Sequence, residues 1–182
     1  TASGELDESD PTDVGQLGDT IITNGVTDAF LRVRSDRVRL RILNGSGGRL
    51  YNLGFSDDRS FHIVASDGGL LAAPVETTRV RLSPGERAEI VVELRSGSAV
   101  SLRSFAFDDR AGVAPAESKR CGLQDAFEIL ALRADPTLRS GPEIPAVLGA
   151  VPAPDISNAA ATRNFDALWG GSNGMYARRL GD

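Results

Sequence analysis

Apolar and charged residues alternate with a period of two, and this pattern constrains the fold more than any other feature. In the segment 38–42, Val38, Leu40 and Ile42 alternate with two arginines. Successive side chains of a β-strand point to opposite faces, so the segment predicts a strand with one buried and one solvated face. Further strands are predicted at residues 51–55, 61–65, 79–82, 90–94, 100–107 and 127–132. No stretch keeps the 3.6-residue period of an amphipathic helix.

Turn residues separate the predicted strands at intervals of roughly 8–12 residues, which is typical of an all-β sandwich or barrel. An Asp-Gly-Gly turn covers residues 67–69, and Pro84 with Gly85 fits the central positions of a type II turn. We expect positive φ at Gly68 and Gly85, and also at Gly25 if the preceding Asn-Gly pair closes a hairpin.

The apolar side of the alternating segments predicts the core. The expected core residues are Leu40, Ile42, Leu53, Phe55, Phe61, Ile63, Ile90 and Val92. Aromatic residues make up only 5% of the chain, so this core has to be built mainly from aliphatic side chains.

Four segments in a fixed order resemble those of a known family. They are Gly18–Gly25 (GDTIITNG), Val38–Gly45 (VRLRILNG), Ala65–Leu71 (ASDGGLL) and Leu82–Glu89 (LSPGERAE). In this order and spacing they resemble the second cupredoxin-like domain of three-domain multicopper oxidases, which include laccase-like, bilirubin-oxidase-like and copper-efflux oxidases. The resemblance runs from about Val14 to Leu148. It implies a Greek-key β-sandwich of the cupredoxin type that lacks the strand with which such a domain opens.

The resemblance and the composition divide the chain into four parts. Residues 1–17 form an acidic arm, residues 18–133 the cupredoxin-like domain, and residues 134–162 a linker with five of the nine prolines. Residues 163–182 contain the single tryptophan, Trp169, and are expected to begin a following domain or to form a docked tail. The acidic residues of the arm are Glu5, Asp7, Glu8, Asp10 and Asp13.

A single histidine and a single cysteine limit the metal chemistry of the chain. A blue-copper site needs two imidazoles and a thiolate, and a structural zinc site needs several such ligands. We therefore predict no catalytic, cofactor-binding or metal-binding residue in this segment. His62 is expected on the solvated face of a strand, and Cys121 as a plain loop thiol. The carboxylate pairs 57–58 and 108–109 fit turns, where Asp side chains bond nearby backbone amides.

Composition excludes other classes of function. A formal charge of −5 and a pI near 5.0 argue against nucleic-acid binding. No apolar run approaches the roughly 18 residues of a membrane-spanning helix. The glycine-rich segment 44–48 leads into a predicted strand, whereas a phosphate-binding loop has to open a helix.

The resemblance implies a bridging role in a copper enzyme that oxidises organic substrates or metal ions and reduces dioxygen to water. In that family copper is bound by histidine-rich motifs of the first and third domains. The expected partners are therefore flanking copper-binding domains or partner chains, including a second copy of this chain, and the segment itself is expected to be non-catalytic. The resemblance implies a secreted or periplasmic location, although the sequence shows no signal peptide.

An alternative class is also compatible with the residues: a stand-alone extracellular β-sandwich used for adhesion, carbohydrate binding or protein binding. In either case an unpaired sheet edge needs to be covered. We expect a partner chain or the C-terminal tail to cover it, with Trp169 and Tyr176 as anchors.

Overall fold

The computed structural model describes residues 17–107, 115–150 and 155–157. The chain divides into two units, Thr1–Ala150 and Val151–Asp182, and the strands described below all lie in the first. The expectations for Asp108 and Asp109, for Trp169 and for Tyr176 lie outside the described residues.

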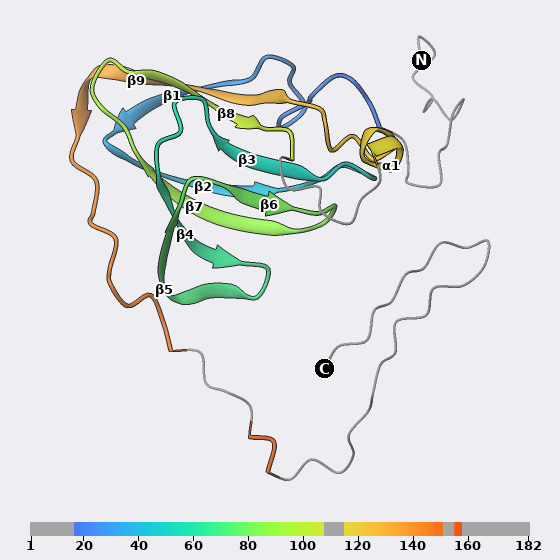
Figure 1. Cartoon of the computed structure of the whole chain (residues 1–182). Coiled ribbons are helices and arrows are strands. Elements are labelled where there is room, and N and C mark those ends of the chain that lie inside the picture. The colour runs from blue at the N-terminus through green and yellow to red at the C-terminus, as the bar shows by residue number, and fades with distance from the viewer. Residues whose placement is uncertain (1–16, 108–114, 151–154, 158–182) are drawn as a thin grey trace. The chain divides into compact units, whose positions relative to one another are not determined.

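The described residues form nine strands in two sheets that pack as a sandwich (Figure 1). One sheet has the order β1-β9-β8-β3-β6 and the other the order β2-β7-β4-β5. The strands are β1 Phe30–Ser35, β2 Arg37–Leu43, β3 Tyr51–Phe55, β4 Phe61–Ser66, β5 Gly69–Thr77, β6 Val80–Leu82, β7 Arg87–Glu93, β8 Ala99–Ser104 and β9 Phe127–Arg139. The chain crosses repeatedly between the sheets, so the predicted Greek-key β-sandwich is confirmed.

Two strands and one short helix differ from the predicted pattern. β5 was not predicted. It contains Pro74, which cannot donate a ladder hydrogen bond but is tolerated because β5 is an edge strand. β1 was also missed, and it pairs with β9 in parallel. The helix α1, Pro115–Arg120, has only six residues and leaves the all-β class unchanged.

The predicted core is confirmed at its centre. Leu53, Phe55, Phe61, Ile90 and Val92 are each at most 2% exposed. The other three predicted core residues are only half-buried and pack against this cluster: Leu40, Ile42 and Ile63. Among the described strands β2 is the last of its sheet, so Leu40 and Ile42 have a neighbouring strand on one side only.

Two of the three predicted glycine conformations are confirmed. Gly25 has φ of 81° and Gly85 has φ of 84°. Gly25 closes a two-residue hairpin between Thr23 and Val26, which exchange backbone hydrogen bonds of 2.9 and 3.1 Å. The expectation for Gly68 was wrong: the positive φ, 116°, is at Gly69, which opens β5 and pairs with Ser66, the last residue of β4.

β9 continues to Arg139, beyond residue 133. It accommodates Pro136 through an irregularity in its pairing with β1, where the register passes from Val33↔Ala134 to Ser35↔Arg139. A proline within a strand is compatible with such a bulge because the extra residues need no ladder hydrogen bond.

Candidate interaction surface at the open edge of the sandwich

The two soft metal donors of the chain lie on different elements. His62 is a half-buried residue of β4, where its register partners are Glu76 of β5 and Val91 of β7. Cys121 follows α1 and is a half-buried free thiol. Within the described ranges, no group of three or more His, Cys, Asp or Glu residues could hold a metal ion. These residues do not fit a blue-copper ion, because one imidazole cannot replace the two that such a site requires.

The carboxylate pair after β3 is engaged in ion pairs. Asp57 lies 2.6 Å from the Arg59 guanidinium, and Asp58 lies 2.5 Å from that of Arg79. The hydrogen bond from Arg59 holds the pKa of Asp57 below its ordinary value of 3.8, because it stabilises the ionised carboxylate. Asp57 therefore bonds within its own turn, and Asp58 links the turn to Arg79.

A hollow of about 900 Å³ opens between the two sheets where both have an edge strand. β1 ends one sheet and β2 ends the other. The lining comes from the segments 20–31 and 40–46 and from residues of β3, β6, β8 and β9, and it is mainly apolar. The sandwich is thus open along this side of the described chain.

Large apolar side chains gather at this opening. Ile22, Val26, Phe30 and Leu43 are between 55% and 65% exposed, and all four line the hollow. They are half of the eight large apolar residues that are exposed among the described residues. Several exposed apolar residues around one hollow favour an interaction surface, whereas single exposed apolar residues are ordinary.

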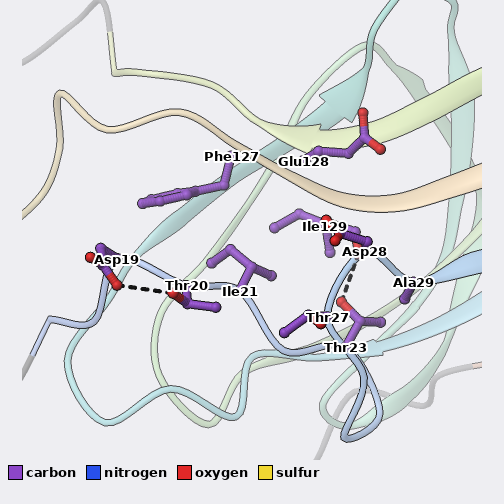
Figure 2. A pocket seen from close by; sticks show the side chains of 10 residues that line it. All are labelled: Asp19, Thr20, Ile21, Thr23, Thr27, Asp28, Ala29, Phe127, Glu128 and Ile129. Atoms are coloured by element: carbon purple, nitrogen blue, oxygen red, sulfur yellow. Dashed lines mark hydrogen bonds between the residues drawn. The ribbon is translucent and has the colours of Figure 1, made fainter.

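A smaller and more polar hollow of about 320 Å³ adjoins the first. Figure 2 shows Phe127 and Ile129, at the start of β9, beside side chains of the segment Asp19–Ala29. The Thr23 hydroxyl donates a 2.6 Å hydrogen bond to the Ile129 carbonyl oxygen, which fixes the segment against β9. Asp28 and Glu128 are among its lining residues. The open edge therefore has an apolar centre and a polar rim, as protein interfaces commonly do.

Arg49 holds the start of the N-terminal segment in place. Its guanidinium is almost fully buried, lies 2.6 Å from the Asp125 carboxylate and donates a 2.7 Å hydrogen bond to the Gly18 carbonyl oxygen. The same group lies 4.7 Å from the centre of the Phe127 ring. The segment that forms one wall of the hollow is thus anchored at its beginning.

The alternation did not single out the four exposed apolar residues, although the sequence carries a signal for three of them. Adjacent apolar pairs occur at 21–22, 30–31 and 42–43. Within a period-two segment, two consecutive apolar residues place one on each face of the chain. One member of each pair is therefore exposed: Ile22, Phe30 and Leu43.

Comparison with known protein families identifies the multicopper oxidase family, whose sequence model matches residues 4–104. Cell division protein FtsP of Rahnella sp. strain Y9602 is 46% identical over 92 residues, covering 50% of this chain and 20% of that protein. FtsP of Escherichia coli K12 is 40% identical over 99 residues, covering 54% and 21%. The chain thus spans about a fifth of the length of these curated relatives.

Solved structures of multicopper oxidases share the fold. The McoA multicopper oxidase of Aquifex aeolicus has a TM-score of 0.69 at 27% identity, covering 85% of this chain and 33% of that one. The laccase-like multicopper oxidase CueO of Ochrobactrum sp. has a TM-score of 0.65 at 32% identity, covering 79% and 30%. This likeness confirms the expected cupredoxin-like fold.

Proposed function

Because the chain belongs to the multicopper oxidase family, we propose that it is the second, structural cupredoxin-like domain of a three-domain protein of that type. Its role is to bridge the domains on either side rather than to hold copper itself. The observation that carries this proposal is the gathering of Ile22, Val26, Phe30 and Leu43 around one hollow at the open edge.

The occupant of the open edge is a neighbouring domain of the same polypeptide. The chain covers 20% of the FtsP proteins and about a third of the McoA oxidase, so similar proteins have several hundred further residues with which to cover it. Four exposed apolar side chains around a polar-rimmed hollow are suited to a lasting contact, because burying each one fully contributes about 1.5–3 kcal/mol. A second copy of this chain is the alternative occupant.

The proposed parent protein is an oxidase that takes electrons from organic substrates or metal ions and reduces dioxygen to water. Support comes from the family match and from the laccase-like oxidase of Ochrobactrum sp.. Its copper would be bound by the other domains. The proposal includes export to the periplasm or the cell exterior, by analogy with the family.

A second candidate function is a role in cell division without oxidase turnover. It is favoured by the higher identity to proteins named FtsP, 40–46%, than to the two solved oxidases described above, 27% and 32%. Both candidates share the bridging role, so they differ only in what the flanking domains do. Copper analysis of the full-length protein together with a chromogenic oxidase assay separates them. Bound copper with turnover supports the oxidase, whereas the absence of both copper and turnover supports the division role.

The bridging role is tested by charge substitutions at the open edge of the full-length protein. We expect Phe30→Asp combined with Leu43→Asp to detach the neighbouring domain, seen as faster limited proteolysis between domains. Leu70→Asp is the matched control, since Leu70 is 47% exposed but does not line the hollow. Equal proteolysis of both variants and the parent would show that the open edge carries no interdomain contact.

A further inference from the structure

Four strands end the two sheets of the described chain: β1 and β6 in one, β2 and β5 in the other. Three of them are poor templates for a further strand. β6 has only three residues, and the register of β1 against β9 shifts after Val33. β5 contains Pro74, and its Ala72 carbonyl oxygen already accepts a 2.9 Å hydrogen bond from the Leu148 N–H. β2 pairs with β7 over seven residues without a register shift. Short length, bulges and proline are among the features that protect sheet edges from pairing, and β2 has none of these three.

The backbone of β2 presents every second residue to the free edge. In an antiparallel ladder, register pairs that exchange hydrogen bonds alternate with pairs that do not. Directly after β2, the Asn44 N–H donates a 3.0 Å hydrogen bond to the Glu86 carbonyl oxygen, so the even-numbered residues of β2 bond to β7. The N–H and C=O groups of Arg39, Arg41 and Leu43 therefore point away from β7, where no other described strand pairs with them.

The inner face of β2 borders the hollow of the open edge. Leu40 and Ile42 are half-buried, pack against the core cluster and line the hollow. Directly opposite residues of two paired strands place their side chains on the same face. A strand beside β2 would therefore lay every second side chain over Leu40 and Ile42 and into the hollow, and these positions require apolar residues.

The outer face of β2 carries more positive than negative charge. Arg39 and Arg41 share one carboxylate, that of Glu89, whereas Arg37 and Arg87 each have a carboxylate of their own. Arg41 is 82% exposed, and its hydrogen bond to Glu89, of 3.1 Å, uses Nε. Its two Nη groups remain available as donors, and a carboxylate is the side chain that accepts from a guanidinium most strongly.

This charge makes a second copy of β2 a poor partner for the edge. In a symmetric antiparallel pair of two β2 strands centred on Leu40, Arg39 of one copy would lie opposite Arg41 of the other. Like charges directly opposite each other destabilise a pair of strands. The edge therefore favours a strand of different sequence with carboxylates on its outer face, and the neighbouring domain of the same polypeptide can supply one.

We propose that the neighbouring domain covers the open edge with a β-strand that pairs with the backbone of β2 at Arg39, Arg41 and Leu43. Apolar side chains of this strand cover Leu40 and Ile42, and carboxylates on its outer face accept hydrogen bonds from Arg41. The main-chain bonds supply affinity and the alternating side chains supply specificity, as in other cases of strand addition to a sheet edge. The inference rests on the proposed bridging function and adds the structure and charge of the partner to it.

The test is amide hydrogen exchange in the full-length protein, read at single-residue resolution. Leu40 and Ile42 bond to β7 in either case and serve as internal standards. We expect Arg39, Arg41 and Leu43 to exchange as slowly as these two. Fast exchange at the three odd-numbered residues would overturn the proposal, as would protection that appears only at high protein concentration, which identifies a second copy. If the charge substitutions at the open edge still detached the neighbouring domain, the bridging function would stand without the added strand.

Arg41→Gln tests the charge of the added strand. Glu89 keeps its ion pair with Arg39 in this variant, so the outer face of the sheet loses no other contact. Losing an opposite-charge pair between neighbouring strands should make Arg39 and Leu43 exchange about 1.5–5 times faster. Arg95→Gln is the matched control, since Arg95 is exposed, follows β7 and does not line the hollow. Equal exchange rates in the two variants would refute the carboxylates opposite Arg41.

Discussion

Asn44 donates a 3.0 Å hydrogen bond from Nδ2 to the Leu82 carbonyl oxygen, which ties the end of β2 in one sheet to the end of β6 in the other. The same amide donates at 2.7 Å to the Arg49 carbonyl oxygen, while its Oδ1 accepts from the Ser46 backbone N–H at 3.0 Å. Asn44 is 2% exposed, so water cannot take over these bonds. One side chain in the glycine-rich turn thus joins the sheets close to Leu43.

We expect Asn44→Ala to lower the free energy of unfolding by about 1–3 kcal/mol, because it leaves buried carbonyl oxygens without a donor. The measurement is urea denaturation followed by circular dichroism. The exposed Gln124 provides a control, and Gln124→Ala should change the stability by no more than about 0.5 kcal/mol. Equal midpoints for the two variants would show that Asn44 does not link the sheets.

Gly54 is required by close packing. A Cβ at this position would lie 2.6 Å from Arg79 Nη1 and 2.7 Å from the Thr78 carbonyl oxygen, and the backbone oxygen cannot easily move. We expect Gly54→Ala to cost about 1–3 kcal/mol by overpacking. Gly47→Ala is the matched control, since no atom lies within 4 Å of a Cβ there. The measurement is thermal denaturation of both variants. An equal loss of stability in the two would contradict this account.

Burial differs between the centre and the edge of the four-stranded sheet. Ile90 of the central strand β7 is fully buried, and Ile90→Ala should cost about 2–5 kcal/mol through the cavity it leaves. Ile42, on the edge strand β2, is half-buried, so Ile42→Ala should cost less. Chemical denaturation under identical conditions checks the order, and an equal or larger loss for Ile42→Ala would contradict it.

The Asp57–Arg59 pair predicts a stability that depends on pH. The folded-state pKa of Asp57 lies below its ordinary value of 3.8, so the unfolded chain binds a proton more readily. The contribution is therefore present above pH 3.8 and is lost as the pH falls through the folded-state pKa. In Asp57→Asn this part of the acid-induced loss should be absent, giving a shallower decline of the unfolding free energy below about pH 4. An unchanged decline would show that the pair contributes nothing.

The alternation predicted which side chains of β2 and β7 face the core, because the period of a strand is a local property of the backbone. It could not predict that β2 lies at an edge, where Leu40 and Ile42 remain half-buried and Leu43 is exposed. Edge position depends on which strands pair, and here β2 pairs only with β7 within the described chain.

The sequence by itself determined the all-β class, the positive φ at Gly25 and Gly85 and the presence of only one imidazole and one thiol, since each depends on residue type or local spacing. The tertiary structure decided where the sandwich opens and which arginines stack on rings. The parallel pairing of Phe30 with Ala131 joins residues a hundred positions apart. Such a contact is selected by the packing of the whole sandwich, and no local pattern specifies it.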